Sequence, residues 1–235
     1  MKRGRVLVVE NDPQCQRLLR VQLSAQEFAV QVIDRGEEAL IAAAEIEPDL
    51  ILLSMSLPGI NGLETCRRLR EWTRTPIIVL DSKEEEPLRV EALEAGVDDC
   101  VAKPFRTAEL LARMRAVLRR THDWTDLSAA TPPLIFRNLT VDMACRRVLL
   151  DGRPLHLTPT EFELLRILTL YAGRVLTHRE ILTRIWGPAS ATDTQYLHVF
   201  VSQLRRKLEP HAGTPQHIIT QPGIGYQFSA EPLSA

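Results

Sequence analysis

Residues 48–62, PDLILLSMSLPGING, carry an apolar strand pattern near 49–53, a polar loop, and the start of a helical pattern near 62–71. The same unit occurs five times in the first 120 residues. We expect strands near 5–9, 29–33, 49–53, 76–80 and 98–101, and helices near 13–26, 36–46, 62–71, 85–95 and 107–120. This alternation predicts an α/β domain with a five-stranded parallel sheet covered by helices on both faces.

The loops that follow the predicted strands are where chemistry is expected, because the carboxyl ends of parallel strands meet at one edge of the sheet. These loops are Glu10-Asn11-Asp12, Ser54-Met55-Ser56, Asp81-Ser82 and Lys103-Pro104.

A change of pattern at 121–133, THDWTDLSAATPP, predicts an interdomain linker because periodicity stops and two prolines close the segment. We therefore expect a first domain at 1–120 and a second at 134–235. Short extended pieces around 134–137, 139–142, 146–150 and 153–157 predict a small antiparallel sheet, with Asp151-Gly152 as a tight turn.

Two capping boxes mark the helices that follow. They are Thr158-Pro159-Thr160-Glu161 and Thr177-His178-Arg179-Glu180. A third helix is expected from about Asp193 to Leu208, and extended pieces at 217–220 and 226–228 predict a terminal β-hairpin. The second domain is thus α+β, with three helices and a hairpin, the arrangement of a winged helix-turn-helix.

The third helix has a polar face suited to reading DNA. Gln195 and His198 lie in its first turns, where a recognition helix contacts base edges, and Arg205-Arg206-Lys207 lie further along, where phosphates are expected. For each residue taken alone, a solvated helix face is the alternative. The full predicted DNA-binding set is Thr194, Gln195, His198, Ser202, Arg205, Arg206 and Lys207.

Composition and charge favour a soluble DNA-binding protein. The 235 residues are 45% hydrophobic and 25% charged, with room for two cores. Residues 1–120 hold 18 Lys and Arg against 20 Asp and Glu, a net −2, whereas residues 134–235 hold 11 against 8, a net +3. A mildly basic second domain suits a nucleic-acid partner without proving one.

Other functional classes find little support. The four cysteines are far apart and sit among apolar residues, which predicts reduced thiols rather than a metal site or disulfides. No apolar run is long enough for a signal peptide or a membrane span, so we expect a cytoplasmic protein with no membrane partner. No P-loop, nucleophile elbow or metal cluster appears, so we expect no enzyme activity, no metal and no cofactor.

Residues 134–228 resemble the winged-helix effector domain of the OmpR/PhoB family of response regulators. The motifs that carry the resemblance are LTPTEFELLRIL, AGRVLTHREIL, VFVSQLRRKLE and TQPGIGYQF. It implies that the third helix enters the major groove of double-stranded DNA and that the loop at 187–191 faces RNA polymerase. IWGP, YLHVFVSQLRRKLEP and GIGYQF are similar to the subgroup that regulates potassium uptake. Pro222 stands where many members have a basic residue at the hairpin tip, so an inserted wing arginine is not expected.

Residues 5–120 resemble the receiver domain of the same family through VLVVEND, PDLILL, SLPGINGLE, PIIVL and GVDDCVAKPF. Receivers accept a phosphoryl group from a histidine kinase on an aspartate beside Mg²⁺. By carry-over, that aspartate position falls on Ser54, and Asn11 replaces one of the acidic residues. A neutral hydroxyl cannot form an acyl phosphate, and Mg²⁺ needs charged oxygens, so weak or absent Mg²⁺ binding is expected and a cognate histidine kinase is doubtful.

The remaining receiver positions also depart from the family. Asp81 stands at the hydroxyl switch position, Cys100 at the aromatic one, and Lys103 is kept. The degenerate pocket thus comprises Glu10, Asn11, Ser54, Asp81 and Lys103. We expect Lys103 to need a counter-charge and name Asp81 as the candidate. An equal alternative is that these positions drifted and Lys103 points into water.

The resemblance also implies a homodimer through the fourth helix, fifth strand and fifth helix. Carried over, the contact positions are Arg89, Val90, Leu93, Asp98, Asp99, Glu109, Leu111, Arg113 and Arg115. Because these charges are kept while the catalytic set is lost, we expect a receiver retained for assembly. Two alternatives stay open: phosphorylation at a non-standard residue (Ser54, Asp12 or Asp49), and a receiver that acts mainly as a protein-binding module.

Overall fold

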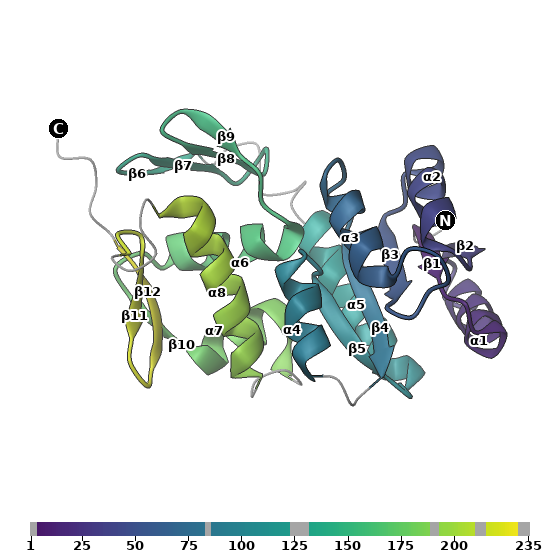
Figure 1. The fold of residues 1–235 in the computed structure, drawn as a ribbon. Coiled ribbons are helices and arrows are strands. Elements are labelled where there is room, and N and C mark those ends of the chain that lie inside the picture. The colour runs from purple at the N-terminus through teal and green to yellow at the C-terminus, as the bar shows by residue number, and fades with distance from the viewer. Residues whose placement is uncertain (1–3, 83–85, 123–131, 189–192, 210–214, 230–235) are drawn as a thin grey trace. The chain divides into compact units, whose positions relative to one another are not determined.

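Two units make up the chain, Met1–Leu118 and Arg119–Ala235. The computed structural model describes residues 4–82, 86–122, 132–188, 193–209 and 215–229 (Figure 1). The predicted linker at 121–133 lies mostly outside these ranges. None of the described helices is both long enough and apolar enough to span a membrane.

The first unit is a five-stranded parallel sheet with the strand order β2-β1-β3-β4-β5, as predicted for a receiver-like α/β fold. Its strands are β1 (Arg5–Val9), β2 (Ala29–Ile33), β3 (Leu50–Ser54), β4 (Ile77–Ser82) and β5 (Asp99–Lys103). Its helices are α1 (Pro13–Ser24), α2 (Gly36–Ile46), α3 (Gly62–Arg70), α4 (Glu86–Glu94) and α5 (Thr107–His122).

The alternation of side chains along each strand explains why helices cover both faces. Val6 and Val8 of β1, with Leu50 and Leu52 of β3, join a core that includes Leu19 of α1 and side chains of α5. Leu7, Val9, Ile51 and Leu53 point to the opposite face and are 0% exposed. The central strand β3 is buried along its whole length, which is why its sequence is a continuous apolar run rather than an alternating one.

The second unit begins with an antiparallel sheet of four short strands in sequence order, β6 (Leu134–Phe136), β7 (Leu139–Asp142), β8 (Arg147–Leu150) and β9 (Arg153–Leu155). The predicted turn at Asp151-Gly152 is confirmed. Both residues have positive φ, 50° and 74°, as a two-residue hairpin turn requires.

Three helices and a second sheet complete the unit, as predicted for a winged helix. They are α6 (Pro159–Leu170), α7 (His178–Trp186) and α8 (Thr194–Leu208), with the strands β10 (Val175–Thr177), β11 (Ile218–Gln221) and β12 (Gly225–Phe228). Both predicted capping boxes are present, at Thr158 and Glu161 for α6 and at Thr177 and Glu180 for α7.

The strand β10 differs from the prediction, which placed no strand between the first two helices. Its last residue, Thr177, is also the N-cap of α7, so the sequence pattern there is that of a helix start. It pairs with β12 at the edge of a sheet ordered β10-β12-β11. A Cβ at Gly225 would lie only 1.9 Å from the carbonyl oxygen of Leu176, so glycine lets the hairpin approach β10 closely. This contact holds the hairpin beside the amino end of α7.

Candidate functional site

A polar pocket at the carboxyl edge of the parallel sheet brings together three of the predicted residues. Glu10 follows β1, Ser54 ends β3 and Lys103 ends β5. The Lys103 Nζ lies 2.5 Å from Glu10 Oε2 and 3.3 Å from Ser54 Oγ. Glu10 is fully buried, so its charge needs this ammonium partner. The positive charge of Lys103 thus balances the negative charge of Glu10.

The remaining oxygens of Glu10 are also engaged. Its Oε1 accepts the backbone N–H of Asp12 at 3.1 Å, and its carbonyl oxygen accepts Gln16 Nε2 at 2.5 Å. Asp12 caps α1, where its carboxylate accepts the N–H groups of Gln14 and Cys15. Asn11 is exposed between them. The acidic loop after β1 therefore serves the local fold.

The resemblance to receivers makes Mg²⁺ the ion to test against this pocket, and the donor set does not fit it. Mg²⁺ favours carboxylate oxygens in octahedral geometry. Here an ammonium group contacts Glu10, Asp12 caps a helix, and positions 11 and 54 offer a neutral amide and a hydroxyl. Among the described residues, no group of three His, Cys, Asp or Glu side chains could hold a metal.

We predicted Asp81 as the counter-charge of Lys103, and the structure records Glu10 as an ionic partner of this lysine. Asp81 pairs with Ala102 in the β4–β5 ladder, but its side chain lies outside the described part of the structure. The Lys103–Asp81 pair therefore stays a prediction. Glu10 can reach Lys103 because β1 ends beside β3, and the long Lys103 side chain contacts residues at the ends of both strands. The sequence analysis places Glu10 in the degenerate pocket but does not identify it as a partner of Lys103.

Close packing brings the next helix against Ser54. A Cβ at Gly62 would lie 2.2 Å from the carbonyl oxygen of Ser54, so only glycine allows α3 to begin at this point.

Two cysteines of the first unit have perturbed thiols. Burial and the adjacent Glu10 raise the pKa of the Cys15 thiol to about 11. Burial raises the pKa of Cys66 to about 11 as well, and its thiol lies 3.6 Å from the carbonyl of Ala95. Both thiols are protonated at neutral pH.

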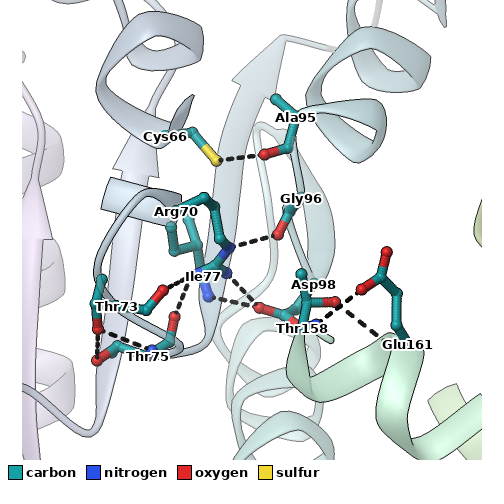
Figure 2. A network of polar contacts seen from close by, with 10 residues as sticks. All are labelled: Cys66, Arg70, Thr73, Thr75, Ile77, Ala95, Gly96, Asp98, Thr158 and Glu161. Carbon is teal, nitrogen blue, oxygen red and sulfur yellow. Dashed lines mark hydrogen bonds and ion pairs between the residues drawn. The ribbon is translucent and has the colours of Figure 1, made fainter. Parts of the chain in front are cut away.

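The two adjacent aspartates of the predicted dimer face have different surroundings. Asp98 Oδ2 accepts Arg70 at 2.7 Å and the Ile77 N–H at 3.0 Å (Figure 2). This carboxylate ties α3 to β4 within the chain, and its predicted contact to a second subunit stays a prediction. Asp99 instead pairs with Arg113 of α5, at 3.1 Å to Oδ1 and 3.4 Å to Oδ2, and Arg113 also contacts Glu109 at 3.4 Å.

The apolar and outer members of that predicted face lie on α4 and α5. Leu93 is buried, Arg89, Val90 and Leu111 are half-buried, and Arg115 is exposed.

Helix α8 presents a polar exposed stripe. Gln195, His198, Ser202 and Arg206 are all exposed, and at 100° per residue they lie within about 80° of one another around the helix axis. Thr194 is half-buried at the first turn. The opposite side carries Leu197, Phe200, Val201, Leu204 and Leu208, all buried. Four of the seven residues in the predicted DNA-binding set lie on this stripe, and their contact with DNA stays a prediction.

Two of the predicted phosphate contacts are engaged inside the domain. Arg205 donates to the Ile218 carbonyl at 3.1 and 2.6 Å and to Thr220 Oγ1 at 2.7 Å. Lys207 Nζ lies 2.5 Å from Glu161 Oε2 at the start of α6. Arg205 and Lys207 each lie about 100° from Arg206 around the helix axis, on opposite sides of it. The three basic side chains therefore point in three different directions. The three residues are adjacent in the sequence, so the sequence alone did not distinguish exposed Arg206 from Arg205 and Lys207, which have partners inside the domain.

A cluster of rings joins α8 to the hairpin. His198 Nδ1 lies 2.6 Å from the hydroxyl of Tyr226 on β12. The His178 ring, at the start of α7, packs edge-on against both rings, with centroids 5.3 Å from His198 and 5.5 Å from Tyr226. Sequence reasoning missed His178 and Tyr226. In the sequence, His178 is part of the second capping box and Tyr226 is part of the terminal GIGYQF motif, and neither pattern predicts a contact with His198.

Two further predictions concern the ends of this surface. Pro222, at the hairpin turn, is exposed as expected for a tip residue. Most of the loop at 187–191 falls outside the described residues, so the predicted polymerase-facing loop is not tested.

Comparison with known proteins agrees with both halves of this description. Residues 6–115 match the family model described as the response regulator receiver domain, and residues 152–228 match the one described as transcriptional regulatory protein, C terminal. The chain is 42% identical to the transcriptional regulatory protein KdpE of Mycobacterium tuberculosis (strain H37Rv) over 225 residues, which are 96% of this chain and 99% of the relative.

Other relatives extend the likeness. The KDP operon transcriptional regulatory protein KdpE of Escherichia coli (strain K12) is 42% identical over 223 residues, covering 95% of this chain and 98% of that protein. Among solved structures, the RitR mutant C128S aligns with a TM-score of 0.79 at 28% identity, covering 96% of this chain and 99% of that one. The similarity spans both units.

Proposed function

Because the chain belongs to the OmpR/PhoB-type response regulators, which are transcriptional regulators with a DNA-binding domain, we propose that it regulates transcription without an aspartyl phosphate. The observation that carries this proposal is the Lys103 ammonium, which lies between Glu10 and Ser54 at 2.5 and 3.3 Å. Its counter-charge is already present in the unmodified pocket.

The chemistry of Ser54 supports the same proposal. An acyl phosphate forms when a carboxylate attacks phosphorus, and a hydroxyl without an adjacent general base is a poor nucleophile. Among the described residues, the ionic group recorded as bonded to this hydroxyl is the Lys103 ammonium, which donates to the hydroxyl and cannot accept its proton. By family analogy, Ser54 stands where the acceptor aspartate is found.

The alternative phosphorylation sites gain no support. Asp12 is used as the cap of α1. Asp49 precedes β3 at the amino end of the strand and accepts the Arg5 N–H at 2.7 Å, so it lies at the edge of the sheet away from Lys103.

We further propose that α8 enters the major groove of operator DNA through Gln195, His198 and Ser202, with Arg206 on the phosphates. The exposed stripe on α8 supports this assignment. Following the family pattern, the chain acts as a homodimer through α4, β5 and α5 and contacts RNA polymerase. No cognate histidine kinase is needed.

The test treats the purified full chain with acetyl phosphate and Mg²⁺ and follows its intact mass and its affinity for an operator. The operator is obtained by genome-wide binding on the native chromosome or by selection from random duplexes. We expect sequence-specific binding, no added phosphoryl group and an unchanged affinity. A response regulator that keeps the acceptor aspartate, treated in parallel, shows that the reagent is active.

Two controls separate the alternatives. Ser54→Ala should leave operator affinity unchanged, because the hydroxyl carries no phosphoryl group. The chain recovered from its native cells should contain no phosphoserine in the peptide that includes Ser54. A phosphorylated wild-type chain, by either route, contradicts the proposal, and so does a change in operator affinity after acetyl phosphate.

A further inference from the structure

The contact between His198 and Tyr226 has a consequence for base reading. The two side chains come from different elements, α8 and β12, and their Nδ1 and Oη atoms are 2.6 Å apart. His198 is exposed on the stripe proposed to face DNA, whereas Tyr226 is only 4% exposed. A buried residue of the hairpin therefore holds one ring nitrogen of an exposed residue of the helix.

The proton in this hydrogen bond has a favoured position. Burial raises the pKa of Tyr226, so the phenol keeps its proton at neutral pH. Arg205, whose guanidinium carbon lies 5.7 Å from the ring centroid, opposes this rise in pKa only partly. A phenolic O–H in a buried setting requires an acceptor. Among the described residues, the acceptor recorded for this hydroxyl is His198 Nδ1. The tyrosine is thus the donor.

A neutral imidazole that accepts at Nδ1 carries its own proton on Nε2. The neighbouring ring is compatible with this state. Burial, and secondarily the proximity of His198, lower the pKa of His178, so that ring is neutral at neutral pH and places no cation beside His198. The exposed nitrogen of His198 is then a hydrogen-bond donor.

We propose that Tyr226 is a positioning residue for sequence recognition, which holds His198 as the Nε2–H tautomer so that it selects a guanine edge in the major groove. This inference rests on the proposed function, because it requires α8 to lie in that groove. Guanine offers two acceptors there, N7 and O6, whereas adenine and thymine offer one each, N7 and O4, and cytosine offers only an N4 amino donor that a donor nitrogen cannot pair with. A fixed donor thus excludes cytosine and favours guanine, which has the most acceptors. Without the tyrosine, the imidazole can present a donor or an acceptor, and selectivity falls.

The tautomer can be measured without DNA. In the full chain labelled with ¹⁵N-histidine, long-range ¹H–¹⁵N spectra at a pH where histidines are neutral distinguish protonated from unprotonated ring nitrogens. The His198 signals are identified by their loss in His198→Gln. We expect Nδ1 to be unprotonated and Nε2 to be protonated, with a mixture of tautomers in Tyr226→Phe. An Nδ1–H tautomer in the wild type, or a tautomer unchanged in Tyr226→Phe, overturns the proposal.

The second measurement uses the operator selected by the wild-type chain. The guanine read by His198 is identified as the one whose substitution lowers the operator affinity of the wild-type chain but not that of His198→Gln. Replacing it with 7-deazaguanine, which lacks the N7 acceptor, should weaken wild-type binding about tenfold. The same replacement should change Tyr226→Phe binding by less than about twofold, because its donor is no longer fixed.

The matched control is Tyr171→Phe, which removes a phenol that contacts Arg184 in the same domain. It should discriminate as the wild type does. A Tyr226→Phe chain that retains the full tenfold loss refutes the positioning role. If the wild-type chain selects no sequence at all, the proposed function fails instead, and the spectra still decide the tautomer.

Discussion

Lys103 and His217 show how a single charged or polar side chain is fixed by what surrounds it. Lys103 ends β5 at a position where a receiver would present it to a phosphoryl group, yet its ammonium contacts the buried carboxylate of Glu10. A buried carboxylate that loses its partner is strongly destabilising. The pair is therefore expected to be a structural requirement of this pocket, whatever chemistry it once supported.

His217 gives the residue-scale prediction. It is 2% exposed, its Nε2 lies 3.1 Å from Asn138 Oδ1, and its ring stacks on Phe228. Burial lowers its pKa in the folded chain, and the nearby Glu209 only partly opposes this. The folded pKa is thus below the unfolded value of about 6.5. The unfolded state binds the proton first, so stability is complete above about pH 6.5 and is lost as the pH falls below it.

The measurement is denaturant unfolding of the second unit within the full chain, at about pH 7.5 and about pH 5.5. One such histidine changes the free energy of unfolding by at most about 1.4 kcal/mol per pH unit. His217→Asn should reduce the loss of stability between the two pH values. The exposed His156, changed to Asn, serves as the control and should leave the loss as in the wild type. Equal pH dependence in wild type and His217→Asn contradicts the prediction.

At the scale of elements, periodic patterns predicted the helices and strands well, and contacts between elements less well. The five βα units and the two capping boxes follow from local apolar runs and cap residues, which act over a few positions. The partners of Arg205 and Lys207 depend on β11 and α6, which are distant in sequence. For the same reason, the roles of Tyr226 and Glu10 could not be read from their own neighbourhoods.

Helix α8 gives the element-scale prediction, because its adjacent arginines face different surroundings. Arg206 is exposed on the polar stripe, whereas Arg205 holds β11 through the carbonyl of Ile218 and the hydroxyl of Thr220. Arg206→Gln should lower the slope of log K against log salt for operator binding by about 0.9, as the loss of one phosphate contact does. Arg205→Gln should leave that slope unchanged.

The stability of the same variants provides the complementary test. Arg205→Lys keeps the charge but loses the forked geometry that bonds two acceptors at once, so it should reduce the free energy of unfolding by about 1–3 kcal/mol. Arg206→Lys, the matched control, should be neutral in stability and in salt slope. If Arg205→Gln lowers the slope as much as Arg206→Gln does, Arg205 is a phosphate contact and the assignment is wrong.

At the scale of the whole molecule, the proposed homodimer requires that the face formed by α4, β5 and α5 joins two chains. Arg113 contacts Asp99 and Glu109 within one chain, so the same groups must exchange partners if they also form pairs across a two-fold axis. A variant at Arg113 alone could act through either arrangement. The design must therefore separate pairs within a chain from pairs between chains.

Two complementary charge reversals make that separation. Arg113→Glu and Asp99→Arg each place like charges at positions 99 and 113, both within a chain and across a dimer of identical variants. Each variant alone should therefore sediment as a monomer and bind the operator weakly. In a dimer that combines the two variants, both cross-subunit pairs between positions 99 and 113 regain opposite charges, while the repulsion inside each chain persists. Mixing them should therefore restore dimers and operator affinity if the pairs act between chains.

Sedimentation velocity of each variant and of their equimolar mixture is the measurement. Arg68→Glu, which reverses a charge paired with Glu64 on α3 outside this face, is the control and should dimerise as the wild type does. A mixture that remains monomeric although both variants are folded, or single variants that dimerise normally, would show that Asp99 and Arg113 serve only the internal structure of the receiver. Restoration in the mixture cannot arise from the intramolecular bonds, because neither chain has recovered them.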